Sequence, residues 1–528
     1  MPSVQEPEPL TLSVNADRLA SALHESCQYG ADHRYGKQST ETGMARLSLD
    51  DSDKAVRDWF LCRAKSLGCS TSIDEMGNLF AIRSGKNPDA PPIMMGSHLD
   101  TQPTGGRYDG ILGVLAGLEV LQVLKENKIE TEGNVGVVNW TNEEGARFPK
   151  MAVSSGVWAG AVPIKDAWNL EEVTPHKGEA KTMLQELERI GYRGQAHASY
   201  KSNPFAAHFE LHIEQGPILE DEGRKIGVVQ GVQAFKWFNI TVRGRDSHAG
   251  TTPLYARKDS VLVAAKMIVA ANAVAQAHDG LATTGIFNAE PGTVNTMAHT
   301  TTFTLDLRHV SDEELAKMVD ECKAAFQSAA QDTEKGCQVD WKLLVDSPAV
   351  VFYPDCISAV EDSAAAVCAK LPGAETKQLW KRMISGAGHD SCYTSLRCPT
   401  SMIFTPTRDG ISHNPTEFCS AEDCALGASV LLGAVLRYDK LRADRGDFGH
   451  TVDVAATALA AGTATTLGAK LPAARRVADI DGTIRTGSTT PVTAAKFSGF
   501  ASLDAEEGKG DNGEGLGKVH DENWRESS

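Results

Sequence analysis

Apolar residues recur along the first part of the chain at the spacings of helices and of buried strands. Helical spacing runs through 52–67 and 111–125, where large apolar side chains return every three or four positions. Short apolar runs at 78–82, 93–96 and 135–140 predict strands. Because helices and strands alternate, we expect an α/β fold with a mostly parallel sheet flanked by helices. Functional sites in such sheets lie beyond the carboxyl ends of the strands.

The middle of the chain shows a second pattern, in which alternating apolar and polar runs are separated by long helical stretches. The predicted strands are 236–243, 282–289, 301–308 and 337–345, and the predicted helices are 258–277 and 311–331. Their order, β-α-β-β-α-β, is the split βαβ or ferredoxin-like pattern. We therefore expect a separate small domain, inserted into the larger one.

The first pattern resumes after this insertion. A helix at 356–371, a strand at 400–404 and a helix at 421–437 are expected to complete the larger domain. After Arg445 the composition shifts to Ala, Gly and Thr, which predicts a disordered tail with at most one weak helix at 451–475. The expected organisation is an N-terminal segment (1–40), a discontinuous larger domain (41–234 plus 351–440), the inserted domain (235–350) and a low-complexity tail (445–528).

Charge and composition narrow the range of partners. The chain has 528 residues and a formal net charge of −17, so it lacks the basic stripe that binding to nucleic acid or an anionic membrane requires. Its 11 cysteines include no Cys-x-x-Cys pair, which favours reduced thiols over a disulfide framework. We identify no signal peptide and no apolar run of about eighteen residues; the best candidate, 425–436, is too short. A cytoplasmic protein is expected.

Candidate chemistry begins in the segment Gly96–Gly110, which lies between an apolar strand and a helix. It contains His98, Asp100 and Asp109. His and carboxylate ligands together suit zinc, manganese or cobalt. The competing interpretation is a surface loop whose polar residues merely cap the helix that begins at Ile111.

Two adjacent carboxylates, Glu143 and Glu144, follow the apolar strand 135–140. Neighbouring residues of an extended segment point to opposite sides. One carboxylate can then bind a metal while the other stands over a bound water. The alternative is an ordinary pair of solvated surface residues.

The segment 208–214 alternates so that four ionisable side chains share one face: His208, Glu210, His212 and Glu214. Burying this face without partners would be costly. Either the face is solvated, or a metal and the groups around it satisfy it. His389 and His413 lie in Gly-containing loops, which bring backbone close to a ligand at little steric cost.

These segments together supply five candidate metal ligands. They are His98, Asp109, Glu144, His212 and His413. Five ligands with one shared carboxylate suit two divalent ions roughly 3.5–4 Å apart. With Asp109 as the bridge, each ion has three protein ligands and keeps open positions, which is typical of catalytic sites.

The motifs resemble those of the two-zinc aminoacylase and carboxypeptidase superfamily over about residues 40–440. The resemblance is strongest to its carbamoyl-amide branch, which contains metal-dependent β-alanine synthases (β-ureidopropionases), N-carbamoyl-L-amino-acid hydrolases and allantoate amidohydrolases. The resemblance rests on five segments: Gly-Ser-His-Leu-Asp-Thr-Gln-Pro, Asn-Glu-Glu-Gly-Ala-Arg-Phe, Glu-Leu-His-Ile-Glu-Gln-Gly-Pro, Ser-His-Ala-Gly-Thr-Thr-Pro and Ser-Gly-Ala-Gly-His-Asp-Ser. His212 stands where the peptidase relatives have a carboxylate, and 108–117 is most similar to β-alanine synthases.

The resemblance implies a role for each site residue. One metal would take His98 and His212 and the other Glu144 and His413, with Asp109 bridging; the metals would be Zn²⁺, with Mn²⁺, Co²⁺ or Ni²⁺ as alternatives. Asp100 would hold the His98 ring, Glu143 would be the general base, and His248 would polarise the scissile carbonyl. The substrate contacts would be Gln215, Asn295 and Arg308. The inserted domain would act as a lid and would pair two subunits into a homodimer.

The function that this resemblance implies is hydrolysis of an N-carbamoyl amino acid to the amino acid, ammonia and carbon dioxide. N-carbamoyl-β-alanine, an intermediate of pyrimidine degradation, is the first expectation for this carboxylate-bearing ureide. The alternatives are hydrolysis of N-carbamoyl-L-amino acids or of allantoate, as in purine degradation. Two other hypotheses about the function remain: catalysis by a Cys392 nucleophile near His389, and an inactive metal-binding scaffold on the same fold.

Overall fold

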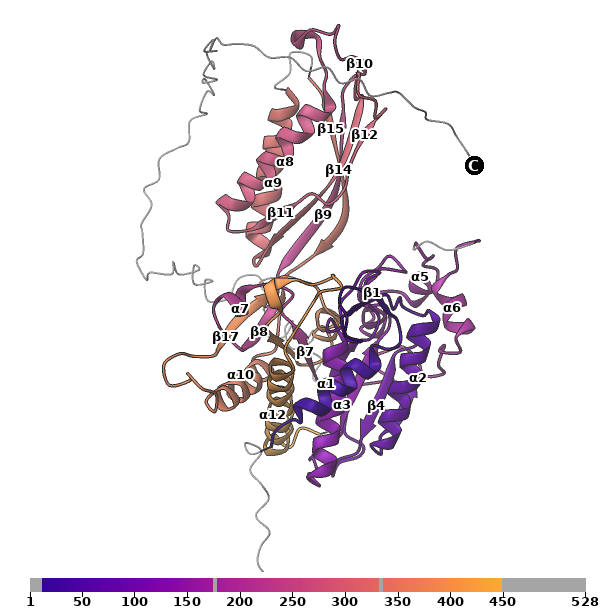
Figure 1. Ribbon diagram of the computed structural model, residues 1–528, viewed down its shortest axis with the longest axis vertical. Coiled ribbons are helices and arrows are strands. Elements are labelled where there is room, and N and C mark those ends of the chain that lie inside the picture. Colours follow the sequence, from indigo (N-terminus) through magenta and orange to yellow (C-terminus); the bar gives the residue numbers. More distant parts are fainter. Residues whose placement is uncertain (1–11, 174–177, 332–335, 449–528) are drawn as a thin grey trace, which may run out of the picture. The chain divides into compact units, whose positions relative to one another are not determined.

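The computed structural model describes residues 12–173, 178–331 and 336–448. Two separate sheets organise these residues (Figure 1). The larger sheet has nine strands in the order β16-β8-β18-β7-β5-β6-β4-β3, with β17 also paired to β8. Their bounds are β3 Ser70–Ile73, β4 Leu79–Arg83, β5 Ile93–His98, β6 Val135–Trp140, β7 Ala207–Ile213, β8 Ile226–Val232, β16 Val350–Val351, β17 Trp380–Ser385 and β18 Thr400–Thr405.

The four central strands of this sheet, β18, β7, β5 and β6, are parallel to one another, whereas the flanking pairs are mostly antiparallel. Their carboxyl ends therefore meet at one edge of the sheet. The predicted α/β fold with a mostly parallel main sheet is confirmed, and the antiparallel flanks are additions to it.

Helices cover the larger sheet. The long ones are α1 Ala16–Ser26, α2 Asp51–Ser66, α3 Ile111–Glu126, α10 Pro354–Cys368 and α12 Ala421–Arg445, and the short ones are α4 Val153–Trp158, α5 Ile164–Trp168, α6 Met183–Arg189, α7 Ile218–Asp221 and α11 Asp390–Thr394. Side chains of α2, α3 and α12 join those of β5 and β7 in the main apolar core. Ile93 and Met95 of β5 enter this core, whereas Met94 enters a smaller aromatic cluster on the other face, as strand alternation requires.

The second sheet belongs to the inserted domain and is antiparallel, in the order β11-β14-β9-β15 with β12 beside β14. The bounds are β9 Ala234–Arg243, β11 Leu281–Thr283, β12 Phe287–Glu290, β14 Thr300–His309, β15 Gln338–Ser347, α8 Ser260–Ala277 and α9 Asp312–Gln331. Helices α8 and α9 pack on one face of the sheet, where they share an apolar core with β9 and β14. This is the expected ferredoxin-like arrangement.

Small elements complete the described chain: β1 Ala31–Arg34 pairs with β2 Thr42–Met44, and β10 Ser247–His248 pairs with β13 Thr296–Met297. Two short 3-10 helices span Leu254–Ala256 and Arg408–Gly410.

Several elements differ from those expected. The strand predicted at 282–289 is divided into β11 and β12. Strands β8 and β17 were not predicted. The apolar run of β8 is interrupted by Gly227, Gln230 and Gly231, and β17 carries polar Lys381 and Arg382 at the edge of the sheet. Helix α12 continues to Arg445, where Gly446 ends it in the left-handed conformation (φ 66°). The expected tail from 449 onwards, with its helix at 451–475, lies outside the described residues.

One helix also corrects the expectation that no segment meets the requirements of a membrane span. Among the described residues, α8 is long and apolar enough to cross a membrane, judged by length and composition alone. A third of its 18-residue window is buried. Val263, Met267 and Ala271 of α8 belong to the core of the inserted domain, so this helix has a packing role that explains its apolar face.

Candidate active site

The five predicted metal ligands meet at the carboxyl edge of the parallel strands. His98 is the last residue of β5 and His212 the last but one of β7, its parallel neighbour. Asp109, Glu144 and His413 reach the same place from the loops before α3, after β6 and after β18. Gly110 makes room for this arrangement, because a Cβ at this position would lie 2.3 Å from the His98 ring.

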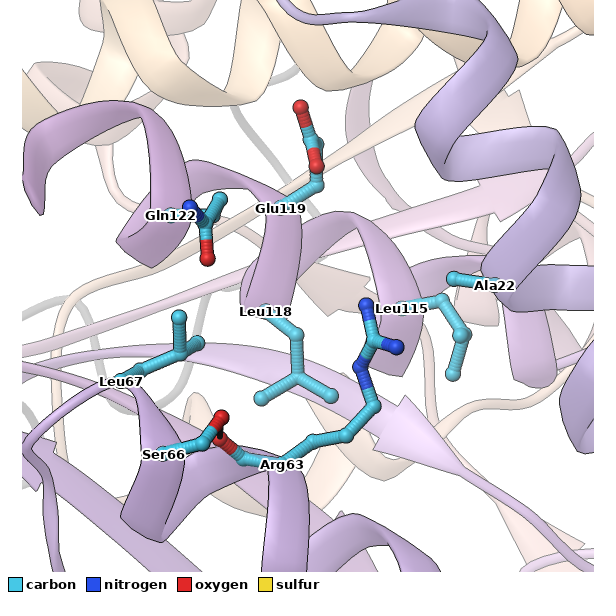
Figure 2. Close-up of a pocket in the computed structure, with 8 residues that line it drawn as sticks. All are labelled: Ala22, Arg63, Ser66, Leu67, Leu115, Leu118, Glu119 and Gln122. Atoms are coloured by element: carbon cyan, nitrogen blue, oxygen red, sulfur yellow. Dashed lines mark hydrogen bonds between the residues drawn. The ribbon is translucent and has the colours of Figure 1, made fainter. Parts of the chain in front are cut away.

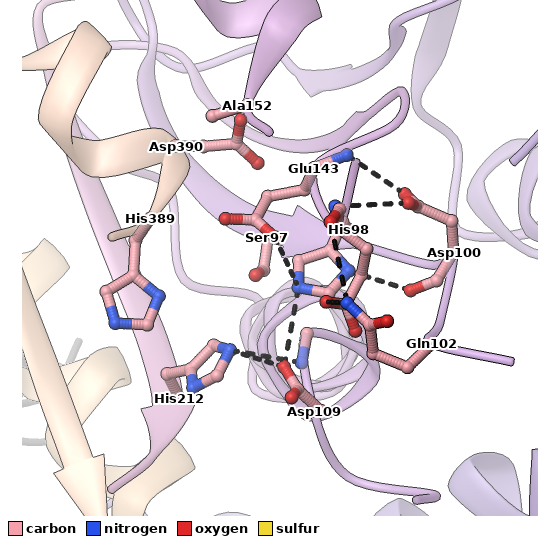
Figure 3. A network of polar contacts seen from close by, with 12 residues as sticks. Ser97, His98, Asp100, Gln102, Asp109, Glu143, Ala152, His212, His389 and Asp390 are labelled. Carbon is pink, nitrogen blue, oxygen red and sulfur yellow. Dashed lines mark hydrogen bonds and ion pairs between the residues drawn. The ribbon is translucent and has the colours of Figure 1, made fainter. Parts of the chain in front are cut away.

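Asp109 stands at the centre of the cluster, and each of its carboxylate oxygens faces a different group of ligands. Its Oδ1 lies 3.0 Å from His212 Nε2 and 3.5 Å from His98 Nε2. Its Oδ2 lies 3.3 Å from His413 Nε2, which is 3.4 Å from Glu144 Oε2. Figure 3 shows His98 and His212 both directed at Asp109. Two sets of three candidate metal ligands thus share one carboxylate.

The electrostatics of the cluster fit a pair of cations. Burial, followed by the charge of Asp109, raises the pKa of Glu144 to about 7, and burial also raises the pKa of Asp100 and Glu143. Holding so many carboxylates ionised in a buried site requires positive charge nearby. Burial opposes the ionisation of Asp109 too, but its imidazole partners hold its pKa well below the usual range. Imidazole nitrogens and carboxylate oxygens are ligands that bind Zn²⁺, Mn²⁺, Co²⁺ or Ni²⁺.

Backbone carbonyls fix the orientation of the two buried imidazoles. His98 Nδ1 lies 2.8 Å from the Asp100 carbonyl oxygen, and His212 Nδ1 lies 2.8 Å from that of Ile213. A carbonyl only accepts, so each Nδ1 carries the proton and each Nε2 keeps its lone pair for a metal. Asp100 therefore contacts the His98 ring through its backbone carbonyl.

The carboxylate of Asp100 has a different task. Its two oxygens accept hydrogen bonds from the backbone N–H groups of Glu143 and Glu144, each at 3.3 Å (Figure 3). It thereby fixes the turn that carries both glutamates. A short-range sequence pattern does not reveal this contact, because it joins the loop after β5 to the loop after β6.

The two glutamates do not lie in an extended segment, which corrects the geometry expected from the sequence. Strand β6 ends at Trp140, and Asn142 adopts a left-handed conformation with φ 59°. Both Glu143 and Glu144 consequently line the same cavity. Glu143 Oε2 lies 3.6 Å from His98 Nε2, while its buried Oε1 has no hydrogen-bond partner among the described residues.

Unusual backbone conformations gather around the cluster. Asn142, Ala152, Gln215 and His413 all have positive φ values between 48° and 60°. Such conformations cost free energy for residues with a Cβ and persist where the surrounding structure enforces them. One enforcing contact is a 2.7 Å hydrogen bond from Ala152 N–H to the Glu143 carbonyl.

A cavity of about 240 Å³ opens beside the ligands. Its lining comes from both domains: Gln102, Asp109, Glu143, Glu144, Met151, His212, Gln215, Phe235, Trp237, Arg308, Ala387, Gly388, His389 and His413. Two of the three predicted substrate contacts, Gln215 and Arg308, are among these residues. Gln215 Nε2 donates to Asp109 Oδ2 at 2.8 Å, so it also orients the bridging carboxylate.

Arg308 is held in place by groups that sequence reasoning missed. Its Nε and Nη2 donate to the Asp306 carboxylate at 3.0 and 2.8 Å, and its Nη1 donates to the Gly386 carbonyl at 2.8 Å. The guanidinium also lies over the Phe235 ring. Of five N–H donors, one on each terminal nitrogen is left for a ligand, which is the fork that a carboxylate accepts. Asp306 lies two residues before Arg308 on the same face of the strand, and this spacing in the sequence could have predicted the ion pair.

His248 and Asn295 are not brought to the cavity within this chain. They lie side by side in the inserted domain, where β10 pairs with β13 and Ala249 N–H donates to the Asn295 carbonyl at 2.9 Å. Both side chains are exposed, and neither lines the cavity. His248 Nδ1 accepts a hydrogen bond from Gly250 N–H at 3.1 Å, and its Nε2 has no hydrogen bond to another of the described residues.

Glu417 is a further buried carboxylate of the site that the sequence analysis did not identify. Its Oε1 accepts hydrogen bonds from the N–H groups of Tyr108 and Asp109, each at 3.0 Å, and its Oε2 accepts from Ser412 Oγ at 2.8 Å. It therefore joins the loop of the bridging ligand to the loop of His413. The sequence feature that could have identified Glu417 is its position, four residues after His413.

The alternating face of β7 resolves into ligands and supporting groups. His212 joins the cluster, and Glu210 accepts hydrogen bonds from Ser97 Oγ at 2.7 Å and Ser391 Oγ at 2.6 Å. All seven residues of β7 are buried, so the face is not solvated. His389, which the sequence analysis left out of the catalytic set, lines the cavity with its ring centroid 4.6 Å from that of His212.

Two other candidate features have weaker geometry. Burial raises the pKa of Cys392 to about 12, which disfavours a thiolate nucleophile.

A small crevice of about 40 Å³ lies between α2 and α3 (Figure 2). Aliphatic side chains such as Leu67 and Leu118 share its lining with polar ones, and its one carboxylate, Glu119, is paired with Arg18 at 2.7 Å. All 11 cysteines are free thiols, as expected.

Comparisons with known proteins agree with this geometry. The model of peptidase family M20/M25/M40 matches residues 94–437. An N-carbamoyl-L-amino-acid amidohydrolase from Rhizobium meliloti is 36% identical over 427 residues, covering 80% of this chain and 96% of the relative. A ureidoglycolate hydrolase from Oryza sativa subsp. japonica is 31% identical over 436 residues, covering 80% of this chain and 85% of the relative.

Solved structures give the same result. An amidase of the hydantoinase/carbamoylase family from Burkholderia multivorans has a TM-score of 0.72 and 39% identity, covering 81% of this chain and 98% of that one. The family match, the relatives and the solved structures concur. The chain therefore belongs to peptidase family M20/M25/M40, within its hydantoinase/carbamoylase branch, and is an amidohydrolase that acts on linear amides.

Proposed function

We propose that the protein hydrolyses N-carbamoyl-L-α-amino acids to the amino acid, ammonia and carbon dioxide. The observation that carries the proposal is the meeting, in one cavity, of the Asp109-centred ligand cluster with Arg308. The cluster suits the attack on the carbamoyl group, and the arginine suits a substrate carboxylate.

The cluster is proposed to hold two divalent ions, most simply Zn²⁺. His98 and His212 would bind one, Glu144 and His413 the other, and Asp109 both. When bound, such ions polarise the carbonyl oxygen and lower the pKa of a coordinated water. Gln102 supports one ligand, because its Nε2 donates to Glu144 Oε2 at 2.7 Å.

Glu143 is proposed as the general base. It would accept a proton from the attacking water at its Oε1 and deliver that proton to the leaving nitrogen, so that the C–N bond breaks and a neutral amine departs. The carbamic acid that remains would then decompose to ammonia and carbon dioxide. Burial, which raises its pKa, favours the protonated form that the second transfer requires.

The relatives support N-carbamoyl-L-amino acids over N-carbamoyl-β-alanine, the first expectation from the sequence. The Rhizobium meliloti protein is named for the former and the Oryza sativa protein for ureidoglycolate. All three compounds combine a urea-type group with a carboxylate. The proposal also includes a cytoplasmic location and a homodimer formed through the inserted domain, as the resemblance implies.

A substrate panel tests this function. Protein loaded with Zn²⁺, Mn²⁺ or Co²⁺ should release ammonia from N-carbamoyl-L-amino acids, and a chelator should abolish the release. Stoichiometric metal binding without turnover of any ureide would favour the inactive scaffold instead.

The proposed binding of the substrate carboxylate by Arg308, here called the carboxylate clamp, has its own test. Arg308→Ala should raise KM for N-carbamoyl-L-amino acids by about tenfold or more, because a charge-assisted fork is lost. The matched control is the uncharged amide of the same substrate, whose KM should change far less. Equal effects on the charged and uncharged substrates would refute the clamp.

A further inference from the structure

The inserted sheet has one face without helices, and its chemistry changes along that face. The opposite face carries the apolar core under α8 and α9. On β9 and β14 the helix-free face is polar over most of its length, with Asn239 opposite Thr304 and Thr241 opposite Thr302. A polar, solvated face is the ordinary arrangement for an antiparallel sheet.

At one end this face is aromatic instead. Phe235 and Trp237 alternate with core residues of β9, and their cross-strand partners on β14 are Arg308 and Asp306. The two rings lie 5.3 Å apart between centroids, and both line the cavity. The aromatic pair thus occurs only where this face of β9 meets the candidate active site, directly beside the proposed carboxylate clamp.

The larger domain supplies a third large apolar side chain to the same cavity, Met151. It lies against the loop 386–388, where a Cβ on Gly388 would be 2.6 Å from Met151 Cε. Gly388 therefore allows this methionine its position, and the neighbouring Gly386 carbonyl receives Arg308 Nη1. Apolar walls from both domains border the clamp.

Apart from the proposed base Glu143, the polar lining atoms that lack a partner among the described residues are neutral, namely Gln215 Oε1 and Trp237 Nε1, so no free charged group faces a charged side chain. The carboxylates of the cavity belong to the ligand cluster or to the proposed base, and the spare donors of Arg308 are committed to the carboxylate. Gln102 and Gln215 already donate to Glu144 and Asp109. A substituent between the carbamoyl group and the carboxylate therefore meets mainly Met151, Phe235 and Trp237.

We infer that Met151, Phe235 and Trp237, here called the apolar wall, bind the side chain of the substrate and select N-carbamoyl-L-α-amino acids with a large apolar side chain. The inference rests on the proposed function and specifies its substrate class. The cavity of about 240 Å³ has to hold the carbamoyl group and the carboxylate as well as this side chain. N-carbamoylglycine and N-carbamoyl-β-alanine have no side chain to occupy the wall.

The test compares kcat/KM across N-carbamoyl derivatives of L-phenylalanine, L-methionine, L-aspartate, glycine and β-alanine on the metal-loaded protein. The phenylalanine and methionine substrates should exceed the glycine substrate by about tenfold or more, the discrimination typical of an apolar pocket. Trp237→Ala should reduce the phenylalanine-to-glycine ratio by about tenfold, and Trp237→Phe should largely preserve it. Asn239→Ala, on the same strand face beyond the cavity, is the matched control and should leave the ratio unchanged.

Met151→Ala provides an independent arm in the other domain and should lower the same ratio. Because each measure is a ratio within one protein sample, a partly folded variant still reports selectivity. Hydrolysis of the glycine, β-alanine or aspartate substrate as efficiently as the phenylalanine substrate would overturn the inference and leave the proposed function standing. Absence of turnover on every ureide would overturn both.

Discussion

At the residue scale, the site depends on contacts that fix single atoms. Asp109 presents one oxygen to His98 and His212 and the other to His413. That these residues meet in one cluster could be predicted from sequence, because His and acid residues stand at strand ends in recognisable motifs. The supporting contacts could not, since Asp100 acts on His98 through its backbone and Glu417 reaches Asp109 from a distant loop.

The first prediction concerns Glu143. Glu143→Gln should lower kcat by at least about 100-fold, because an amide cannot take the proton from water. Metal content, measured by elemental analysis, should stay at the wild-type value. Glu144→Gln is the contrasting variant, which should lose metal. A kcat within about tenfold of wild type would show that another group is the base.

The second prediction concerns Glu417. Glu417→Ala leaves two buried N–H groups of the Asp109 loop without their acceptor, so metal affinity measured against a competing chelator should fall about 10–100-fold. Glu417→Gln keeps an acceptor oxygen and should restore most of that affinity. If the alanine variant loses thermal stability but binds metal within about threefold of wild type, the residue is structural only.

At the element scale, periodicity identifies the long helices and the buried strands but not how they end. Strand β6 ends at the predicted residue, yet the turn after it has Asn142 in a left-handed conformation, and both glutamates face the cavity as a result. Strand β17 was missed because a polar edge strand lacks the apolar signal. Alternation and helical spacing report burial, whereas turn geometry depends on tertiary contacts.

The third prediction concerns the pairing of α8 with α9. His278, which caps α8, contacts Glu314 through Nδ1 and Glu321 through Nε2, each at 3.0 Å. The contact with Glu314, foremost, raises the pKa of His278. The protonated ring is thus favoured in the folded state. Its contribution to stability is complete below about pH 6.5, the pKa of a free imidazole, and is lost as the pH rises through the raised pKa of the folded protein.

The Tm of the wild type should therefore fall more between pH 6 and pH 9 than that of His278→Gln. Thermal unfolding of both proteins at several pH values measures the difference. The double variant Glu314→Gln with Glu321→Gln should reproduce the shallower pH dependence of His278→Gln. Identical slopes for wild type and His278→Gln would contradict the assigned contact.

At the scale of the whole molecule, the order of elements was sufficient to predict two sheets of different type, one inserted into the other. The sequence could not predict which inserted residues reach the ligands. Arg308 does so, since it bonds Gly386 of the larger domain, whereas His248 and Asn295 lie exposed outside the cavity. Spacing along a chain does not determine contacts between domains.

The fourth prediction concerns the location of His248. If the inserted domain of a second subunit delivers it, as the proposed homodimer allows, coexpressed His248→Ala and Glu143→Gln chains should complement each other. Mixed dimers would contain one intact site, giving about a quarter of wild-type activity. Each variant expressed alone is the control and should be nearly inactive. Failure to complement would favour closure of the domain within one chain.

The sharing of Asp109 between two ligand groups has a consequence for how the protein matures. His98 emerges early during synthesis and His413 close to the end of the larger domain, with the inserted domain made in between. A growing chain that stops short of His413 lacks part of the second group, although Gln215 Nε2 can already donate to the far oxygen of the shared carboxylate. Both proposed metal sites are therefore complete only after His413 has been synthesised and has folded back onto Asp109.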